Sequence, residues 1–405
     1  MAQGYAASST DAGLLSPSLF SPAGWALQPN GEVNIDLLTN FASRSVHDMV
    51  VIGKTVTGSF YGTQVKYSYW NGCSTGGRQG MVAAQKYPKD FDGILAGAPA
   101  IYWDQYVVAE HWPQVVMKEA NVFPTNCELD AVTEAAIEAC DELDGVKDNV
   151  ISNTAACKFD PFTLVGKKIQ CDGEERTITR AIAFTVHKIW DGPETTAGQQ
   201  LWYALQRGAP LTYLANTTQA GNGTRTGNPF FVNDAWIRYF LKRDPTFDTS
   251  SIDTKTLTKL FAQSAQKYEK LIGSSDPDLS GLRQAGGKLL VWHGEADQLI
   301  FPQDSVKYRH EVERLQGGGR MTDKFFRLFL APGVDHCGLG TTAGAIPKDP
   351  FGALVEWVES GKAPESLASV APSGFTRKVC RYPLVAKFLG GDSSLESSYG
   401  CGDSF

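Results

Sequence analysis

The 405-residue sequence has no long apolar run, no surplus of basic residues and no closely paired cysteines. No stretch approaches the roughly 18 consecutive apolar residues of a membrane-spanning helix, so we expect no membrane span. The 44 acidic residues outnumber the 37 basic ones, and no basic stripe occurs, which argues against nucleic acid as a partner. With 42% hydrophobic and 20% charged residues, the composition is that of a globular chain with one large core or two domains.

The eight cysteines include no C-x-x-C pair, which disfavours a zinc or redox site and favours disulfides formed in an oxidising compartment. Glycosylation sequons at Asn216 and Asn222 point to the same compartment. However, residues 1–11 lack the apolar segment of a secretory signal. Two interpretations follow: a cytosolic protein with free cysteines, or a secreted protein whose chain begins after its natural N-terminus. The motifs described below favour the second.

Strand-like and helix-like segments alternate in the first hundred residues. Residues 4–7 resemble a short strand, and residues 35–51 carry apolar side chains at helical spacing, with Asn34 as a cap and Gly53 as an end. An aromatic, β-prone segment, a turn, a helix stopped by a proline and a further strand follow, at residues 65–70, 71–74, 75–87 and 93–97. This alternation predicts a parallel α/β sheet.

Between residues 102 and 284 the pattern changes to mixed helices and long polar loops, which hold four cysteines and both sequons. The strand and helix alternation then resumes, with expected elements at residues 288–292, 305–315 and 325–330. The sequence therefore predicts a catalytic domain formed by residues 1–101 and 285–405, and an inserted domain formed by residues 102–284.

The pattern G-x-S-x-G occurs at residues 72–76, between an expected strand and an expected helix. In α/β-hydrolases this context forms the nucleophile elbow, a sharp turn that lifts the serine hydroxyl clear of the sheet. Glycines are needed there because side chains flanking the serine would collide. The motif predicts that Ser74 is a nucleophile.

A serine hydroxyl needs a histidine base and a carboxylate that orients it, and this fold places them in the order Ser, Asp or Glu, His. Asp297 and His336 follow two expected strands, so both should lie at the sheet edge that carries Ser74. Asp335 is adjacent to His336, and adjacent side chains in an extended loop diverge, so Asp297 is preferred. Four other histidines are expected to be structural or solvated: His47, His111, His187 and His310. His293 is expected to be a loop residue with a hydrogen-bonding role.

Cys73 precedes the predicted nucleophile and Cys337 follows the predicted base. If Ser74 and His336 are hydrogen-bonded, these neighbours are forced close, and a disulfide needs Cα atoms within about 7 Å. We therefore expect a Cys73–Cys337 bridge that holds the two catalytic loops together.

The segment 67–80, with residues 87–88, 91–93 and 96–99, closely resembles the tannase and feruloyl esterase family. The family's hallmark is a Cys-Ser, Asp, His-Cys arrangement, which Cys73-Ser74, Asp297 and His336-Cys337 match. The resemblance covers nearly the whole chain. It implies an α/β-hydrolase fold in which residues 102–284 form a lid over the active site.

Three aspartates, Asp141, Asp144 and Asp148, surround a glycine turn in the insertion. Oxygen donors at this density suit Ca²⁺, although a solvated acidic loop is the alternative that the residues leave open. The resemblance implies a structural calcium site, with the carbonyls of Val146 and Val150 as further ligands. By the same analogy we expect the pairs Cys140–Cys157 and Cys380–Cys401. Cys127 and Cys171 remain, and they are paired by exclusion only.

The oxyanion of an acyl-transfer intermediate needs two backbone N–H donors. One is expected from Thr75, the residue after the nucleophile. In similar proteins the second comes from a glycine-rich loop that lies upstream of a segment resembling residues 4–11. We therefore expect that the first strands of the catalytic domain are missing from this sequence.

These observations predict a secreted serine carboxylic ester hydrolase that forms an acyl-enzyme on Ser74. The resemblance implies aromatic esters as substrates, either small molecules or esters linked to polysaccharide, with feruloyl or other hydroxycinnamoyl esters first and galloyl esters second. The alternative from another class is a truncated, catalytically impaired homologue that binds aromatic esters without cleaving them. The sequence makes no prediction about oligomeric state.

Overall fold

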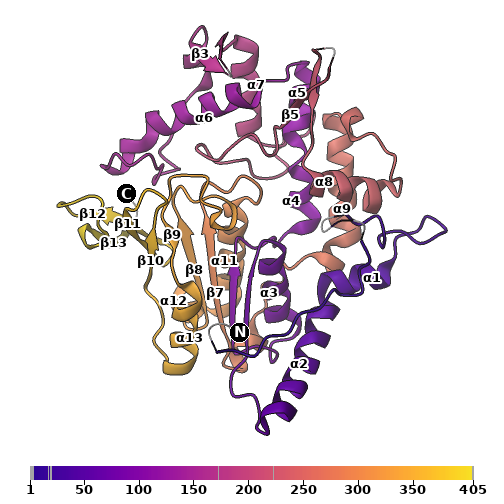
Figure 1. The fold of residues 1–405 in the computed structure, drawn as a ribbon, viewed down its shortest axis with the longest axis vertical. Coiled ribbons are helices and arrows are strands. Elements are labelled where there is room, and N and C mark those ends of the chain that lie inside the picture. The colour runs from indigo at the N-terminus through magenta and orange to yellow at the C-terminus, as the bar shows by residue number, and fades with distance from the viewer. Residues whose placement is uncertain (1–3, 17, 19–20, 172, 222, 404–405) are drawn as a thin grey trace.

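The computed structural model describes residues 4–16, 18, 21–171, 173–221 and 223–403. At its centre lies a four-stranded sheet in the order β1-β2-β7-β8, in which every neighbouring pair is parallel (Figure 1). The strands are β1 (Tyr69–Cys73), β2 (Gly93–Gly97), β7 (Lys288–Gly294) and β8 (Phe326–Ala331). The predicted parallel α/β sheet is therefore confirmed, although β1 begins four residues later than expected and extends through the expected turn to Cys73.

The sheet is buried on both faces, as parallel sheets usually are. Along β7, Leu289 and Val291 pack into one hydrophobic cluster, whereas Leu290 and Trp292 pack into another. This alternation follows from the two-residue period of a strand, which sends successive side chains to opposite faces.

Helices cover both faces of the sheet. On one face lie α3 (Thr75–Lys86), α11 (Pro302–Gln316) and the short α12 (Gly319–Thr322), and α3 and α11 contribute Met81 and Tyr308 to the larger cluster. On the other face α13 (Pro350–Ser360) contributes Leu354 and Trp357 to the smaller cluster. The expected helices at residues 75–87 and 305–315 therefore correspond to α3 and α11.

The N-terminal part differs from the sequence-based expectation in two places. Residues 4–7 form no strand, and the helical segment consists of α1 (Ile35–Thr39), the π-helix η1 (Asn40–Arg44) and α2 (Ser45–Tyr61). The side chain of Asn34 caps α1 as expected, but the helix continues past Gly53 and ends at Gly62, which adopts a φ of 68°. Gly53 serves a close approach instead, because a Cβ there would lie 2.6 Å from Oγ of Ser8.

The insertion leaves the sheet after β2, returns before β7, and lies above the upper ends of the strands (Figure 1). It is mainly helical, with two short hairpins. Its first part comprises α4 (Trp103–Ala109), α5 (Trp112–Ala120), α6 (Asn126–Cys140), η2 (Asp141–Asp144), η3 (Pro161–Leu164), β3 (Lys168–Cys171) and β4 (Glu174–Thr177). Its second part comprises α7 (Arg180–Asp191), β5 (Thr217–Gln219), β6 (Arg225–Gly227), α8 (Phe231–Ala235), η4 (Trp236–Lys242), η5 (Thr249–Ser251), α9 (Thr254–Ile272) and α10 (Ser280–Gln284). The division into a catalytic domain and an inserted domain stays a prediction.

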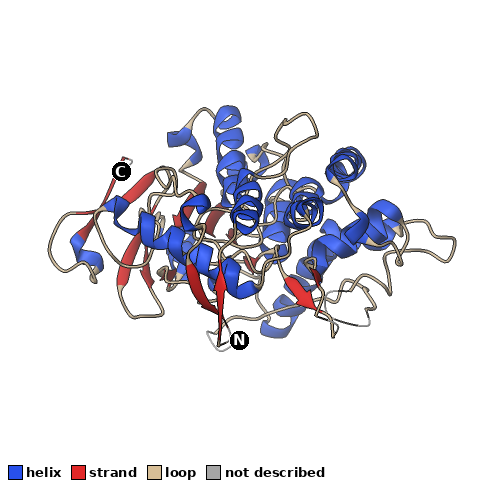
Figure 2. Cartoon of the chain, turned by 90° about the horizontal axis from the view of Figure 1, so that it is seen from above, coloured by secondary structure: helices blue, strands red, loops and turns tan. Residues whose placement is uncertain are grey.

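The C-terminal region adds antiparallel strands beside β8, on the left in Figure 2. They are β9 (Ile346–Pro347), β10 (Ser366–Val370), β11 (Thr376–Cys380), β12 (Leu384–Phe388) and β13 (Tyr399–Asp403), with η7 (Glu396–Ser398) before the last. A disulfide between Cys380 and Cys401 joins β11 to β13. Two further bridges, Cys127–Cys171 and Cys140–Cys157, lie within the insertion.

The part of the chain that the structure describes has no helix with the length and hydrophobicity to cross a membrane. Of the two sequons, Asn216 is partly exposed, and its side-chain oxygen accepts a hydrogen bond from Asn126. Asn222 lies outside the described residues. Glycosylation at either position stays a prediction.

Candidate active site

Ser74 lies at the sharp turn between β1 and α3, with φ of 62° and ψ of −122°. Positive φ is uncommon for a residue with a side chain, and strain of this kind clusters at functional sites. Backbone hydrogen bonds hold the turn, because Ser74 donates its N–H to Gly97 and accepts hydrogen bonds from the N–H groups of Arg78 and Ala100. The serine is therefore fixed at the carboxyl end of β1, at the sheet edge where the sequence placed it.

The glycines around Ser74 permit this turn, but not all for the expected reason. A Cβ on Gly72 would lie 2.6 Å from the backbone of Gly76, so a side chain there would collide across the turn. A Cβ on Gly76 itself would meet nothing within 4 Å. The second tight position is Gly77, where a Cβ would lie 2.5 Å from the carbonyl oxygen of Gly97. The turn therefore needs Gly72, inside the motif, and Gly77, directly after it, for space.

The expected bridge between Cys73 and Cys337 is present, with Cα atoms 5.9 Å apart and 264 positions of sequence between them. Cys337 adopts a φ of 57° within the short helix η6 (His336–Gly338). Because Ser74 and His336 are the direct neighbours of the bridged residues, the bridge brings their two loops together.

Asp297 and His336 form a buried hydrogen-bonded pair. Nδ1 of His336 lies 2.8 Å from Oδ2 of Asp297, and the two residues are 7% and 1% exposed. The other carboxylate oxygen accepts hydrogen bonds from the N–H groups of Leu299 and Ile300 at 2.9 and 2.8 Å. The sequence-predicted acid and base are therefore in direct contact.

Asp335, the alternative acid, has a different set of partners. Its carboxylate accepts hydrogen bonds from the backbone N–H of Gly340 and from the N–H and hydroxyl of Thr341. It therefore holds the loop after His336 and makes no hydrogen bond to the imidazole ring.

Two buried neighbours contact the pair: His293, for which the sequence predicted a hydrogen-bonding role, and Gln298, which the sequence did not single out. His293, expected in a loop, lies on β7 and contacts the carboxylate of Asp297 at 3.2 Å. The side-chain oxygen of Gln298 accepts a hydrogen bond from the backbone N–H of His336 at 3.0 Å. For His293, the position four residues before Asp297 was the available signal. The contact of Gln298 depends on the fold.

The charges of the pair shift both pKa values. Burial opposes the charged form of Asp297, but the charge of His336 and hydrogen bonds from His293 and His336 outweigh it and lower the pKa of Asp297. For His336, burial lowers the pKa. The charge and hydrogen bond of Asp297 and the charge of Asp335 raise it by more, so the pKa of His336 lies above the ordinary value of 6.5. Asp297 is therefore ionised at neutral pH, as an orienting acid must be.

Thr75 begins α3, so its N–H is one of the first-turn donors that a helix leaves without an internal acceptor. Such a donor beside Ser74 meets the requirement for one oxyanion contact.

The acidic loop after α6 is folded around Asp141. This residue is 3% exposed, and its Oδ1 accepts hydrogen bonds from the N–H groups of Asp148, Asn149 and Val150. Asp144 Oδ1 accepts a hydrogen bond from the N–H of Val146. Oδ1 of Asp148 accepts a hydrogen bond from the N–H of Val150, so each of the three aspartates directs an oxygen at the loop's own backbone.

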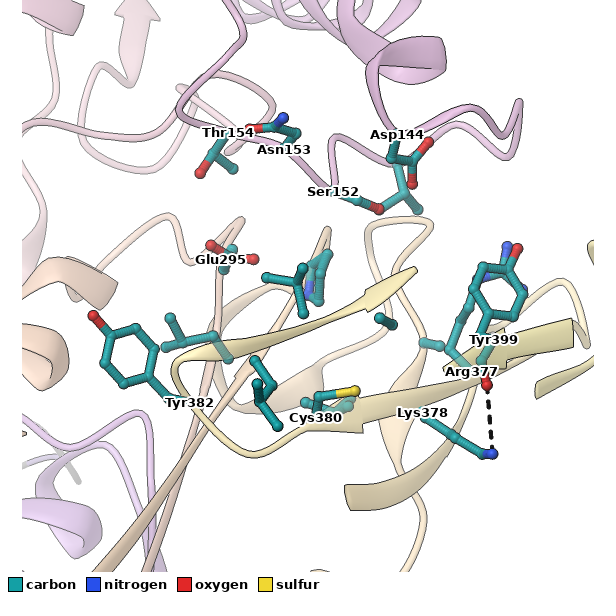
Figure 3. A pocket seen from close by; sticks show the side chains of 18 of the residues that line it. Asp144, Ser152, Asn153, Thr154, Glu295, Arg377, Lys378, Cys380, Tyr382 and Tyr399 are labelled. Atoms are coloured by element: carbon teal, nitrogen blue, oxygen red, sulfur yellow. Dashed lines mark hydrogen bonds between the residues drawn. The ribbon is translucent and has the colours of Figure 1, made fainter. Parts of the chain in front are cut away.

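The second carboxylate oxygen of Asp148 faces the C-terminal region. This Oδ2 pairs with the guanidinium of Arg377 on β11, next to a pocket of about 330 Å³ between the loop and the C-terminal strands (Figure 3). Burial raises the pKa of Asp148 to about 6, against the opposing effect of Arg377. Within the described ranges no three acidic, histidine or cysteine side chains are arranged to hold a metal ion. The loop as it lies therefore does not fit Ca²⁺ without a rearrangement of the Asp148 carboxylate.

Comparisons with known proteins agree with this geometry. A family model described as "Tannase and feruloyl esterase" matches residues 1–402. The chain is 52% identical to a probable feruloyl esterase of Arthroderma benhamiae over 100% of this chain and 76% of that protein. It is 33% identical to a probable feruloyl esterase B-2 of Aspergillus fumigatus over 90% of this chain and 72% of that protein.

Two solved structures share the fold. A tannin acyl hydrolase from Aspergillus niger is 25% identical and superimposes with a TM-score of 0.86, covering 93% of this chain and 72% of that one. Feruloyl esterase B from Aspergillus oryzae is 29% identical with a TM-score of 0.77, covering 92% and 76%.

Proposed function

The chain belongs to the tannase and feruloyl esterase family, and on that premise we propose that it is a serine carboxylic ester hydrolase that cleaves aromatic esters. The observation that carries the proposal is the arrangement of Ser74 on a strained elbow, disulfide-linked through its neighbour to the loop of His336, whose imidazole contacts Asp297. Acyl transfer through a serine requires a nucleophile, a base that removes its proton and an acid that orients the base.

In the proposed mechanism, Oγ of Ser74 attacks the ester carbonyl carbon while Nε2 of His336 takes its proton. Asp297 holds the ring with Nδ1–H directed at the carboxylate and stabilises the imidazolium. The N–H of Thr75 binds the oxyanion. His336 then protonates the departing alcohol, and a water molecule, deprotonated by His336, hydrolyses the acyl-enzyme.

The names of the relatives support a substrate class. Feruloyl esters are the first candidate because the 52% identical relative is a probable feruloyl esterase. Galloyl esters are the second, because one structural neighbour is a tannin acyl hydrolase at lower identity.

A panel of feruloyl, galloyl and unsubstituted benzoyl methyl esters tests both parts of the proposal. We expect the purified chain to hydrolyse the feruloyl ester with the highest kcat/KM, and Ser74→Ala to lose about 10⁴- to 10⁶-fold in kcat. Equal rates for the wild type and Ser74→Ala would remove Ser74 from the mechanism. A preference for the galloyl ester would keep the mechanism and reverse the substrate order.

We further propose that the protein is exported to an oxidising compartment. The support is that all eight cysteines are paired, in four bridges. Expression from the protein's own gene in its native host, followed by detection in the medium, tests this, and retention inside the cell would contradict it.

Calcium at the acidic loop stays a proposal, supported by three carboxylates within eight positions and opposed by the pairing of Asp148 with Arg377. If Ca²⁺ binds there, its removal by a chelator lowers the Tm, and Asp141→Asn abolishes that response. If the ion pair alone holds the loop, the chelator changes nothing and Arg377→Met lowers the Tm.

A further inference from the structure

His293 is a fully buried histidine near the end of strand β7, just before the loop that carries Asp297. Both nitrogens of its ring have partners. Nδ1 lies 2.8 Å from Oγ of Ser305 on α11, and Nε2 lies 3.2 Å from Oδ2 of Asp297 and 3.1 Å from the carbonyl oxygen of Ile300. The carboxylate oxygen that it contacts is the same one that His336 contacts at 2.8 Å.

The identity of these partners fixes the proton on the ring. Nε2 faces a carboxylate and a carbonyl, which accept and do not donate, so the hydrogen must be on Nε2. Nδ1 then accepts, and the hydroxyl of Ser305 is able to donate to it. A ring with its hydrogen on Nε2 therefore satisfies every contact, and the carboxylate and the carbonyl at Nε2 select this tautomer.

We propose that His293 is a positioning residue of the proposed triad, which donates a hydrogen bond to Asp297 and holds its carboxylate in the orientation that His336 requires. The inference rests on the proposed function. The N–H groups of Leu299 and Ile300 hold Oδ1, and His293 with His336 holds Oδ2. Without His293, Oδ2 keeps a single hydrogen-bond donor, which is the ring that must move protons.

The charge distribution around Asp297 makes this donor matter. Glu110 at the end of α4 and Asp304 on α11 are buried acids, and the charge of Asp297 raises the pKa of each after the larger effect of burial. Asp335 adds its charge beside His336. The hydrogen bond from His293 therefore stabilises the Asp297 carboxylate among these buried acids.

Removal of the donor has two consequences. The carboxylate is less firmly held, so kcat falls. More of its negative charge acts on His336, so protonation of His336 becomes easier and the acid limb of the kcat/KM profile moves to higher pH. A residue that merely fills space would lower the Tm when it is truncated and would leave that limb in place.

Two amide variants separate these roles, because each mimics one side of the ring. The amide nitrogen of Gln replaces Nε2, so His293→Gln keeps a donor toward Asp297. His293→Asn reaches only the Ser305 side and loses that donor. We expect His293→Asn to lose about ten- to hundredfold in kcat with KM within about twofold, and to shift the acid limb upward. We expect His293→Gln to lose less and to keep the limb of the wild type.

Ser305→Ala serves as the third variant, because it removes the hydroxyl partner of Nδ1 while leaving His293 in place. A loss of kcat smaller than that of His293→Asn is expected. The low-field proton resonance of the Asp297–His336 hydrogen bond gives an independent readout, which should shift in His293→Asn and stay in His293→Gln.

Equal kcat and equal acid limbs in the wild type, His293→Asn and His293→Gln would overturn the positioning role, as would losses in both variants that follow their Tm alone. The Ser74→Ala variant separates this failure from that of the proposed function. If Ser74→Ala is inactive while His293→Asn behaves as the wild type, only the positioning role fails. If Ser74→Ala keeps full activity, the triad itself fails.

Discussion

Asp297 and Asp148 are buried or nearly buried aspartates, each beside a basic residue, yet their environments have opposite effects. Two backbone N–H groups, His293 and His336 surround Asp297. The charge of His336 and the hydrogen bonds of both histidines outweigh burial and lower the pKa of Asp297. Asp148 has Arg377 as a partner, but burial outweighs it and raises the pKa to about 6. The difference lies in the charges and donors nearby: two histidines face Asp297, whereas Asp148 has one arginine and two further aspartates, Asp144 and Asp141, whose charges raise its pKa.

Asp297→Asn and Asp148→Asn test most directly whether the two carboxylates differ in their effect on catalysis. We expect Asp297→Asn to lower kcat by about 10³- to 10⁴-fold, because the amide cannot accept from His336 as the carboxylate does and favours the wrong tautomer. Asp148→Asn, the matched change outside the triad, should leave kcat within about twofold. Steady-state kinetics on the feruloyl ester measures both, and similar losses in the two variants would contradict the distinction.

The two regions also differ in the bridges that hold them. Cys73–Cys337 spans 264 positions and joins two separate catalytic loops, whereas Cys140–Cys157 spans 17 and staples the acidic loop. Chain entropy alone predicts roughly 5 to 6 kcal/mol for the long closure and roughly 3 kcal/mol for the short one.

Removal of each bridge by paired Cys→Ala substitution tests whether the two disulfides differ in their effects on stability and on kcat. Without Cys73–Cys337 we expect both a lower free energy of unfolding and a fall in kcat of at least about tenfold, because the loops of Ser74 and His336 lose their link. Without Cys140–Cys157 we expect a smaller loss of stability, measured by denaturant unfolding, and an unchanged kcat. A normal kcat in the folded Cys73→Ala, Cys337→Ala protein would show that the link does not position the triad.

The stability contributions of Asp297 and Asp148 are expected to change with pH in opposite directions, and the activity depends on the protonation of His336. His336 must be neutral to act as a base and its pKa lies above 6.5, so kcat/KM should fall as pH drops through that raised value. Asp297, with its lowered pKa, stabilises the fold above about pH 4 and loses this effect only as pH falls through the lowered value.

Asp148 acts in the opposite direction on stability. Because its folded pKa is about 6, the folded state binds more protons than the unfolded state, and stability falls as pH rises from about 4 to 6. Asp148→Asn should remove that decline, as measured by Tm across the range. An unchanged pH profile of Tm in this variant would contradict the raised pKa.

The sequence was sufficient where the chemistry is local. The elbow motif predicted the turn at Ser74, and the cysteines beside the nucleophile and the base predicted the bridge that the structure contains. Gly53 was misread because glycine usually weakens a helix, whereas here it lets Ser8 approach. The sequence predicted a hydrogen-bonding role for His293 but not its partners, and it did not single out Gln298, because these contacts are set by how β7, α11 and the loop of His336 pack together. The pairing of Asp148 with Arg377, 229 positions apart, has no signal in either segment.

Covalent trapping tests the central claim that Ser74, His336 and Asp297 act together as a nucleophilic unit. The protein is incubated with an aryl phosphonate ester, and the adduct is located by peptide mass spectrometry in the wild type, Ser74→Ala and His336→Ala. We expect one adduct on Ser74 in the wild type, none in Ser74→Ala and a strongly slowed reaction in His336→Ala. An adduct on another residue, or labelling of Ser74 at the same rate without His336, would contradict it.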